Sequence, residues 1–403
     1  MKKNRLIAMA LTGAMCVSML AGCGGGNAKQ EAGNDAAAET IKIGMLAPMT
    51  GAVAQYGIAV TNGAKMYIDE VNANGGINGK QVEVVLYDEE GDTTKALTGY
   101  SSLIDQGVTA IIGDVTTAPT VAVAAESQAD NMPLITASAT ASAVTGQVDA
   151  DGNVTSVYPN VFRSCFIDPF QGEKMAAFAK ENLNATKVAV LYNTGSDYSV
   201  GLTNAFIAKA GELGMEVVAS EGYSDGAVDF QGQLTNIAAK APDALFCPDY
   251  YQVIALVAQQ AKDAGVTATM LGGDGWDAVL SVVSDTALLE GAYYCSGYSS
   301  QDTTEAVQTF LANYQAKYES EPNMFAAQGY DAAMILLAAV EKAEAAGLTA
   351  GSDEYKQAVI DAMDATDMDC ITGHVTYDEY NNPEKTAVII KVENGEATFW
   401  GKY

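Results

Sequence analysis

The sequence predicts an α/β protein built from two Rossmann-like, doubly wound lobes joined by crossover hinge strands. Two observations carry this prediction: strands alternate with helices from about residue 41, and the same alternation starts again at about residue 187. Alternation at this spacing indicates right-handed βαβ crossovers and a parallel sheet. The chain from Thr40 to Tyr403 has about 360 residues, which is too many for one compact core and suits two lobes.

The first alternation begins with a mainly apolar stretch over 41–47, which predicts a buried strand. Apolar residues at helical spacing then predict a helix over 58–74, which Asn74-Gly75-Gly76 ends in the manner of a glycine cap. The same reading predicts, in order, a strand over 81–87, a helix over 93–106, a strand over 109–112, a helix over 118–130 and a strand over 134–136.

The stretch over 137–160 is rich in Ser, Thr, Asp and Gly, which predicts a loop and a lobe boundary. The second alternation is then expected as strands over 187–192, 216–221, 244–247 and 269–271, with helices over 199–213, 230–239 and 252–264. Three helices are predicted within 304–364, followed by strands over 375–377 and 387–392.

This late return to strands indicates that the chain crosses between the lobes more than once. We expect one lobe from residues 41–162 with 298–375, and the other from residues 163–297 with 376–403.

The amino terminus carries an export signal. Lys2, Lys3 and Arg5 precede an apolar run that closes in Leu20-Ala21-Gly22-Cys23, so residues 1–22 are typical of a signal peptide. Cysteine directly after Leu-Ala-Gly resembles a bacterial lipobox, which implies a lipid on the sulfur of Cys23. Residues 24–39 lack aromatic and β-branched side chains, and we expect 23–40 to be a flexible, lipid-anchored linker.

The charge of the chain argues against several classes of partner. The net charge is −29, and removing the three basic residues of the signal makes it −32. So acidic a chain is not suited to nucleic acid or to docking on anionic lipid. His374 is the single histidine, which excludes a His-rich zinc site and leaves an enzyme without a plausible nucleophile–base pair. Four cysteines remain in the body with no C-x-x-C spacing, and they are either free or paired in one of three ways: Cys165, Cys247, Cys295 and Cys370.

The chain matches neither of the two glycine-rich motifs that bind nucleotides in α/β folds. The stretch Gly75-Gly76-Ile77-Asn78-Gly79-Lys80 has Asn74 where a phosphate loop needs glycine, and it follows a helix, so we interpret it as a turn. No Gly-x-Gly-x-x-Gly follows the first strand, and the doubly wound fold therefore has no dinucleotide signature.

Ligands of open α/β sheets gather at the carboxyl ends of the strands, close to helix N-termini. In the first alternation these ends carry hydroxyl groups and an aromatic ring; in the second they carry tyrosines and acidic groups. Hydroxyls on one lobe suit a carboxylate, and acidic groups on the other suit an ammonium, so together they would hold an α-amino acid as a zwitterion. The segments concerned are 49–51 with Tyr56, 114–117, 138–140, 197–198, 249–251 and 274–276.

A family resemblance adds to this reading. The body opens with Ile41-Lys42-Ile43-Gly44, Ala47-Pro48-Met49-Thr50-Gly51 and Ala54-Gln55-Tyr56-Gly57 and continues with Asn62-Gly63-Ala64, Asn72-Ala73-Asn74-Gly75-Gly76-Ile77-Asn78-Gly79 and Tyr87-Asp88. In this order the stretches resemble the leucine/isoleucine/valine-binding proteins of ABC importers, within the periplasmic-binding-protein type I superfamily of clamshell folds. The likeness runs from Thr40 to Tyr403.

The resemblance implies roles on the first lobe. Tyr56 takes the place of an aromatic residue that covers the ligand side chain. Thr117 matches a hydroxyl that holds the ligand carboxylate, helped by the segment Ser138-Ala139-Thr140 and its backbone groups.

On the second lobe, Tyr198 and Tyr250 match aromatic residues that complete the lid over the ligand. Asp274 stands where the family commonly has Glu and would accept the ligand ammonium, with a reach shorter by one methylene.

Phe325 matches an aromatic residue of the side-chain pocket. The amino-terminal disulfide of the best-known member is missing, with Thr116 at one of its positions.

The expected function is a solute-binding lipoprotein that feeds an ABC importer, takes a branched-chain or other apolar amino acid, and needs no cofactor or metal. Its expected partners are the amino acid, an ABC permease and the membrane through Cys23, outside the cytoplasm and without nucleic acid. Two alternatives stay open. The ligand could be an aromatic amino acid, an amide or a polyamine, and Asp249, expected beside Asp274 at a neighbouring strand end, keeps the more cationic ligand open. The clamshell could also report its ligand to a receptor.

Overall fold

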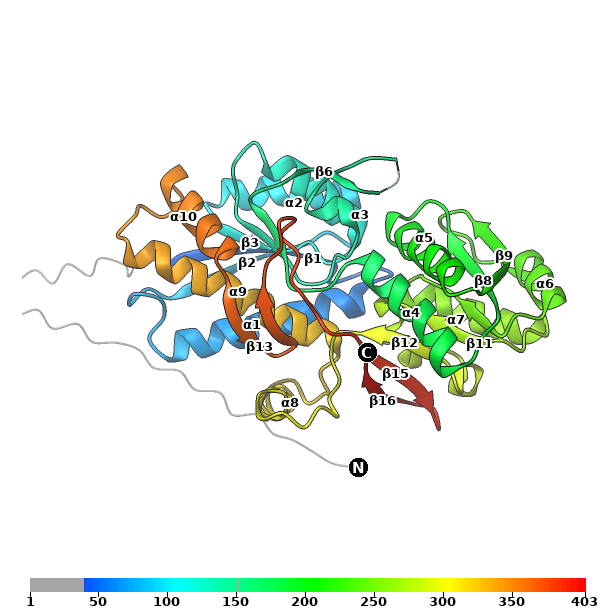
Figure 1. Ribbon diagram of the computed structural model, residues 1–403. Helices are drawn as coiled ribbons and strands as arrows, with labels where there is room; N and C mark the ends of the chain where they lie inside the picture. The colour runs from blue at the N-terminus through cyan, green and yellow to red at the C-terminus, as the bar shows by residue number, and fades with distance from the viewer. Residues whose placement is uncertain (1–39, 151) are drawn as a thin grey trace, which may run out of the picture. The chain divides into compact units, whose positions relative to one another are not determined.

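The computed structural model describes residues 40–150 and 152–403 (Figure 1). The predicted signal peptide over 1–22, the lipidation site at Cys23 and the linker, apart from Thr40, lie outside these residues. Two parallel or mainly parallel sheets, each covered by helices, organise the described chain. No helix within 40–150 or 152–403 is long and apolar enough to span a bilayer.

The first sheet has the strand order β2-β1-β3-β4-β7 and is parallel throughout. Helices cover both of its faces, because successive residues of each strand point to opposite sides. Ile43 and Met45 of β1 pack in the core that α1 and α9 share, whereas Leu46 packs with residues of α2 and α3. This sheet and its helices comprise β1 (Ile41–Ala47), β2 (Val82–Asp88), β3 (Ala110–Ile112), β4 (Leu134–Thr136), β7 (Val161–Arg163), α1 (Ala54–Ala73), α2 (Thr93–Asp105), α3 (Thr117–Ser127), and the later α8 (Glu305–Tyr318), α9 (Met324–Ala345) and α10 (Asp353–Asp364).

Helices α1 and α9 approach each other closely because glycine stands on each at the contact. A Cβ atom at Gly63 of α1 would lie 1.9 Å from the carbonyl oxygen of Ala326, and one at Gly329 of α9 would lie 2.3 Å from that of Val60. The late helical block thus packs against the first lobe, although α9 begins more than 250 residues after α1. Lys317 of α8 adds an ion pair with Asp69.

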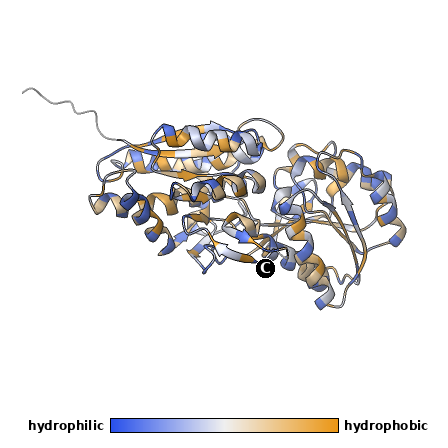
Figure 2. Cartoon of the chain, turned by 90° about the horizontal axis from the view of Figure 1, so that it is seen from above, coloured by the Kyte–Doolittle hydropathy of each residue, from blue (hydrophilic) through white to orange (hydrophobic). Residues whose placement is uncertain are grey.

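The second sheet has the order β16-β15-β12-β11-β10-β8-β9. Its strands from β9 to β12 are parallel, and β15 and β16 close the other edge in antiparallel pairing. Hydrophobic residues run along the helices and strands of both sheets (Figure 2). The elements are β8 (Lys187–Asn193), β9 (Glu216–Tyr223), β10 (Ala244–Phe246), β11 (Thr269–Gly272), β12 (Tyr293–Ser296), β15 (Val388–Glu393), β16 (Glu396–Lys402), α4 (Asp168–Asn182), α5 (Asp197–Glu212), α6 (Gln231–Lys240) and α7 (Tyr251–Asp263).

The chain passes between the two lobes three times: after β7, after β12, and between the hairpin β13 (Asp367–Cys370)–β14 (Gly373–Thr376) and β15. This hairpin is tied to α9, because Asp331 accepts hydrogen bonds from the amides of Ile371 and Thr372, at 2.7 and 3.0 Å. The doubly wound fold class is confirmed. The residue limits of the two lobes stay a prediction.

Most predicted elements are present with shifted ends, but the loop prediction over 137–160 is wrong. This stretch holds an antiparallel pair, β5 (Gly146–Val148) with β6 (Val154–Val157), and β7 then continues the first sheet. Helix α4 and strands β12, β13 and β16 were also not predicted. The glycine stretch before β2 is a turn, as expected, and a Cβ at Gly76, where φ is +75°, would meet the Lys80 carbonyl oxygen at 2.0 Å.

The four cysteines of the body are free and buried. Burial raises the pKa of the Cys165 thiol to about 12, which keeps it protonated and unreactive. Within 40–150 and 152–403 no cluster of His, Cys, Asp or Glu side chains could hold a metal ion.

Candidate functional site

A small cavity lies where the strand ends of the two sheets face each other. Eight of the nine ligand-binding residues predicted from the sequence line it: Tyr56, Thr117, Ser138, Thr140, Tyr198, Tyr250, Asp274 and Phe325. The ninth, Ala139, is buried beside it, and its carbonyl oxygen accepts a hydrogen bond from Arg163. Val115, Thr116 and Gly275 also line the cavity. They belong to segments that the sequence singled out, and Thr116 adds a second threonine hydroxyl next to Thr117.

The first lobe presents a hydroxyl group and a helix N-terminus to the cavity. Thr117 is the first residue of α3, and its buried Oγ1 atom has no hydrogen-bond partner among the described residues. The first amides of a helix have no partner within the helix and favour negative charge. This end of the cavity therefore suits a carboxylate.

Ser138 and Thr136 fix the segment that faces α3. The Ser138 hydroxyl donates to the carbonyl oxygen of Val115 at 2.7 Å, so its oxygen is left to the cavity as an acceptor. The amides of Ser138 and Ala139 donate to Thr136 Oγ1 at 3.3 and 3.1 Å. Of these two hydroxyl groups, that of Thr117 is therefore the one left to donate into the cavity.

The second lobe presents a buried carboxyl group. Asp274 follows β11, and its Oδ1 atom accepts a hydrogen bond from the Tyr198 hydroxyl at 2.8 Å. Its amide donates to Gln171 Oε1 at 2.9 Å, and the Gly275 amide donates to the Tyr198 hydroxyl oxygen at 2.9 Å. Burial raises the pKa of Asp274 to about 6, against the opposing effect of Tyr198 and other hydrogen-bond donors. A buried carboxylate without a basic neighbour favours a cation.

Aromatic rings fill most of the space between these two ends. Tyr56 stacks on Phe325 with ring centroids 4.1 Å apart, and Tyr198 stacks on Tyr250 at 5.0 Å. The centre of a water molecule can occupy only about 10 Å³ of the cavity, which is about enough for one water. An amino acid can therefore enter only if the rings or the lobes separate.

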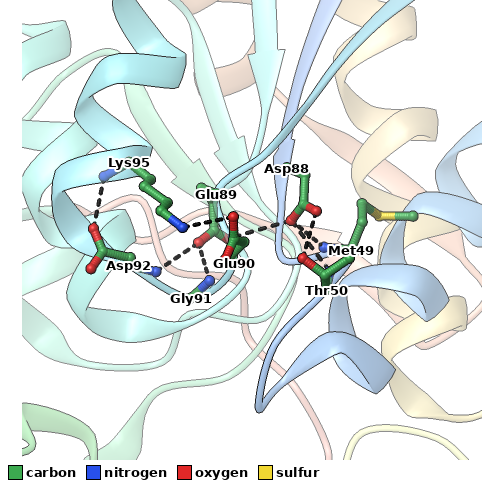
Figure 3. A network of polar contacts seen from close by, with 8 residues as sticks. All are labelled: Met49, Thr50, Asp88, Glu89, Glu90, Gly91, Asp92 and Lys95. Atoms are coloured by element: carbon green, nitrogen blue, oxygen red, sulfur yellow. Dashed lines mark hydrogen bonds and ion pairs between the residues drawn. The ribbon is translucent and has the colours of Figure 1, made fainter.

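Tyr56 reaches across from the first lobe. Its hydroxyl donates to the Gly275 carbonyl oxygen at 2.5 Å and accepts from the Tyr251 amide at 3.1 Å. The loop that leads into α1 is held by Asp88 at the end of β2, which accepts from the Met49 amide at 2.9 Å and from Thr50 Oγ1 at 2.8 Å (Figure 3). Strand β2 thereby fixes the start of the helix that carries Tyr56.

Two further buried carboxyl groups lie near the site. Asp249 accepts from the Tyr223 hydroxyl at 2.5 Å and from the Tyr250 amide at 2.6 Å, and it does not line the cavity. Asp168, in the first turn of α4, is fully buried, and neither of its oxygens has a geometric hydrogen-bond partner among the described residues. Sequence reasoning missed Asp168 because it missed α4.

The fold and this site define a class of protein. Two α/β lobes linked by three chain crossings, with polar and aromatic groups from both lobes around one cavity, are typical of a hinged solute-binding protein. The cavity is lined by hydroxyl, aromatic and carboxyl side chains and has no Lys, Arg or His on its walls.

Comparison with known proteins gives the family. The family model described as "Periplasmic binding protein" matches residues 40–397, and the chain belongs to this family of solute-binding proteins, which are not enzymes. The Leu/Ile/Val-binding protein BraC3 of Rhizobium johnstonii is 29% identical over 340 residues, covering 84% of this chain and 88% of the relative.

Two solved structures show the same fold. The leucine binding protein LivK from Thermotoga maritima has a TM-score of 0.80 and 32% identity, covering 90% of this chain and 98% of its own. The branched-chain amino acid transporter substrate binding protein LivJ from Streptococcus pneumoniae, in complex with isoleucine, has a TM-score of 0.80 and 31% identity, covering 91% and 100%.

Proposed function

We propose that this protein is the extracytoplasmic binding component of an ABC importer and takes a branched-chain or other apolar amino acid into the cavity between its lobes. One observation carries the choice of ligand: the unpartnered Thr117 hydroxyl at the start of α3 lies on the same cavity as the buried carboxyl of Asp274. A zwitterion has one charge for each end, and the rings between them favour an apolar side chain. The names of the relatives, which include Leu, Ile and Val, agree with this choice.

The proposed roles follow from the positions of the side chains. Thr117 donates to the ligand carboxylate, with Ser138, Thr140 and the backbone groups of their segment beside it, and Asp274 accepts from the ammonium. Tyr56, Tyr198, Tyr250 and Phe325 enclose the side chain. Ala139 acts through its backbone.

We propose hinge closure as the mechanism. The groups that bind the ligand lie on both lobes, and they can contact one ligand together only when the lobes are close. The ligand therefore binds the closed state more tightly than the open state and shifts the equilibrium toward it. The three chain crossings supply the hinge, with the lobe limits proposed at 162/163, 297/298 and 375/376. The closed protein would then dock on a permease, and a lipid on Cys23 would hold it at the membrane.

A more cationic ligand, such as a polyamine, is less well supported. A polyamine would need a second carboxylate on the cavity wall, but the carboxyl of Asp249 is bonded to Tyr223 and Tyr250 and does not line the cavity. Aromatic amino acids and amides stay as alternative ligands, and a sensor role stays as an alternative to transport.

A thermal-shift screen of the body from Thr40 onward tests the proposal. Tight binding to the native state raises the melting temperature by mass action. We expect L-leucine, L-isoleucine or L-valine to give the largest shift among amino acids, aromatic amino acids, amides and polyamines. A largest shift from a polyamine or an amide would overturn the proposed ligand class.

A further inference from the structure

Two acidic side chains of the first lobe lie close together, outside the set of residues that line the cavity. Glu89 follows β2, Asp114 follows β3 by two residues, and both are fully buried; the two strands flank β1 in the sheet. Glu89 Oε2 accepts the amides of Gly91 and Asp92, and Asp114 Oδ1 accepts the Val115 amide (Figure 3 shows the Glu89 turn). The remaining oxygens, Glu89 Oε1 and Asp114 Oδ2, have no other partner among the described residues.

The pair requires a proton to be stable. Two carboxylates in contact inside a protein cannot both stay ionised, because burial and mutual repulsion both penalise the second charge. Burial raises the pKa of each group, and the negative charge of the neighbouring Glu89 raises the pKa of Asp114 further.

Within residues 40–150 and 152–403, no Lys, Arg or His side chain forms an ion pair with Glu89 or Asp114. The charged groups around this pair come from the same turn: Asp88, Glu90, Asp92 and Lys95, and the Lys95 ammonium is paired with Glu90 at 2.6 Å. Asp88 adds negative charge beside Glu89. Residues 115–121 follow Asp114 directly, and residues 137–140 follow Thr136, which donates to the Asp114 carbonyl oxygen; neither stretch contains a charged side chain.

Asp114 connects this pair to the walls of the cavity. Its carbonyl oxygen accepts from Thr136 Oγ1 at 2.6 Å, and Thr136 Oγ1 in turn accepts from the amides of Ser138 and Ala139. Its carboxyl group holds the amide of Val115, whose carbonyl oxygen accepts from Ser138. The segments over 115–117 and 138–140 are thus both anchored on Asp114.

We propose that Glu89 and Asp114 share one proton at neutral pH, and that this proton holds the segments over 115–117 and 138–140 in their ligand-binding arrangement. Asp114 is then a positioning residue. Loss of the proton in alkaline solution places two negative charges side by side, and their repulsion displaces Asp114 and the two segments that it holds. Ligand affinity should therefore fall with rising pH, beyond what the ligand's own titration causes.

The first test reads the proton directly and does not depend on the ligand. Infrared spectra at pH 7 should contain the carbonyl stretch of protonated carboxyl groups, and Asp114→Asn should lose part of this band. Glu89→Gln is the mirror variant: its amide can donate to Asp114, while its oxygen still accepts the amides of Gly91 and Asp92. Glu90→Gln, which removes a charge from the same turn, should keep the whole band. A band of full intensity in both Asp114→Asn and Glu89→Gln would overturn the proposal.

The second test rests on the proposed function and measures L-leucine affinity by calorimetry from pH 7 to pH 9. Between pH 7 and pH 9 we expect the affinity of the wild type and of Glu90→Gln to fall by a factor about fivefold or more larger than that of Asp114→Asn. The fall is smaller in Asp114→Asn because its amide can donate to Glu89 at every pH. Parallel profiles for wild type and Asp114→Asn would contradict the positioning role.

If neither the wild type nor any variant binds leucine, isoleucine or valine, the proposed function fails and the melting temperature decides the shared proton. A carboxyl whose pKa is raised by folding stabilises the fold at low pH and loses that contribution as pH rises through the raised value. Wild type should therefore lose more stability than Asp114→Asn between pH 7 and pH 9, and an equal loss would overturn the shared proton.

Discussion

The Tyr56 hydroxyl donates a hydrogen bond to the Gly275 carbonyl oxygen, which joins the first helix of one lobe to the loop after β11 in the other. The same hydroxyl accepts from the Tyr251 amide at the start of α7. One side chain of the first lobe therefore contacts two elements of the second at the edge of the cavity.

Tyr56→Phe should loosen the contact between the lobes while keeping the stack on Phe325. The two hydrogen bonds are lost, at a cost of about 1 kcal/mol each or less, so the unliganded protein should populate more open conformations. Small-angle scattering should show a larger radius of gyration without ligand and little change with it. Tyr192→Phe, which removes a hydroxyl elsewhere in the second lobe, is the control. An unchanged radius for Tyr56→Phe would contradict the role of this contact.

Asp274→Asn should weaken the binding of L-leucine by well over tenfold. An ammonium left without its charged partner in a buried site costs on the order of 2–5 kcal/mol. Calorimetry at pH 7.5 measures the effect, and Asp263→Asn, an exposed substitution at the end of α7, should bind as the wild type does. Equal affinities for all three proteins would remove Asp274 from the site.

The raised pKa of Asp274 gives binding and stability opposite dependences on pH. Because the pKa is about 6, affinity should fall as the pH is lowered from 7.5 to 5 and the carboxylate becomes protonated. In the unliganded protein the contribution of Asp274 to stability is present at low pH and is lost as the pH rises through about 6. Calorimetric titrations at several pH values, repeated with Asp274→Asn, check this: the acid-side loss should shrink in the variant.

Thr117→Val keeps the shape of the side chain but removes its hydroxyl. We expect a loss of about 1–3 kcal/mol in binding, because a buried ligand carboxylate then lacks a donor. The melting temperature without ligand should change little, since the hydroxyl has no partner in the described protein. Thr94→Val, on the exposed first turn of α2, is the matched control. A Thr117→Val protein with wild-type affinity would place the carboxylate elsewhere.

Arg163→Met should destabilise the fold rather than act on the ligand alone. The guanidinium is fully buried and donates to the carbonyl oxygens of Ala139 and Ala141 at 3.1 and 3.0 Å. Leaving these groups unpaired should cost on the order of 3 kcal/mol of unfolding free energy, measured by urea denaturation. Lys240→Met, at the exposed end of α6, should cost almost nothing, and a similar small effect at Arg163 would refute this structural role.

Elements and site residues could be predicted from the sequence where the hydropathy pattern and the residue chemistry indicate the same structure over several residues. Strand β1 is a run of seven mainly apolar residues, and the hydroxyl, tyrosine and carboxyl groups of the site stand directly after strands. Strand β7 has only three residues, and helix α4 buries Gln171 and Gly172 against its neighbours, which interrupts the apolar stripe that reveals a helix. Both were missed for these reasons.

Contacts between segments that are far apart in the sequence are set by the fold of the whole chain and leave no local pattern. The bond from Tyr56 to Gly275 joins residues 219 positions apart, and the Glu89–Asp114 pair forms only because β2 and β3 both lie beside β1. The aromatic and acidic residues of the site could be selected from the sequence, but the residues that they contact could not be predicted, because only the folded chain brings them together.

The measurement that tests the central claim most directly is a calorimetric comparison of L-leucine with two analogues that each lack one charge. L-leucinamide lacks the carboxylate, and 4-methylpentanoate lacks the ammonium. If Thr117 and Asp274 bind the two ends of a zwitterion, both analogues should bind the wild type at least about tenfold more weakly than leucine. Leucinamide binding as tightly as leucine would contradict this account and favour an amide or a more cationic ligand.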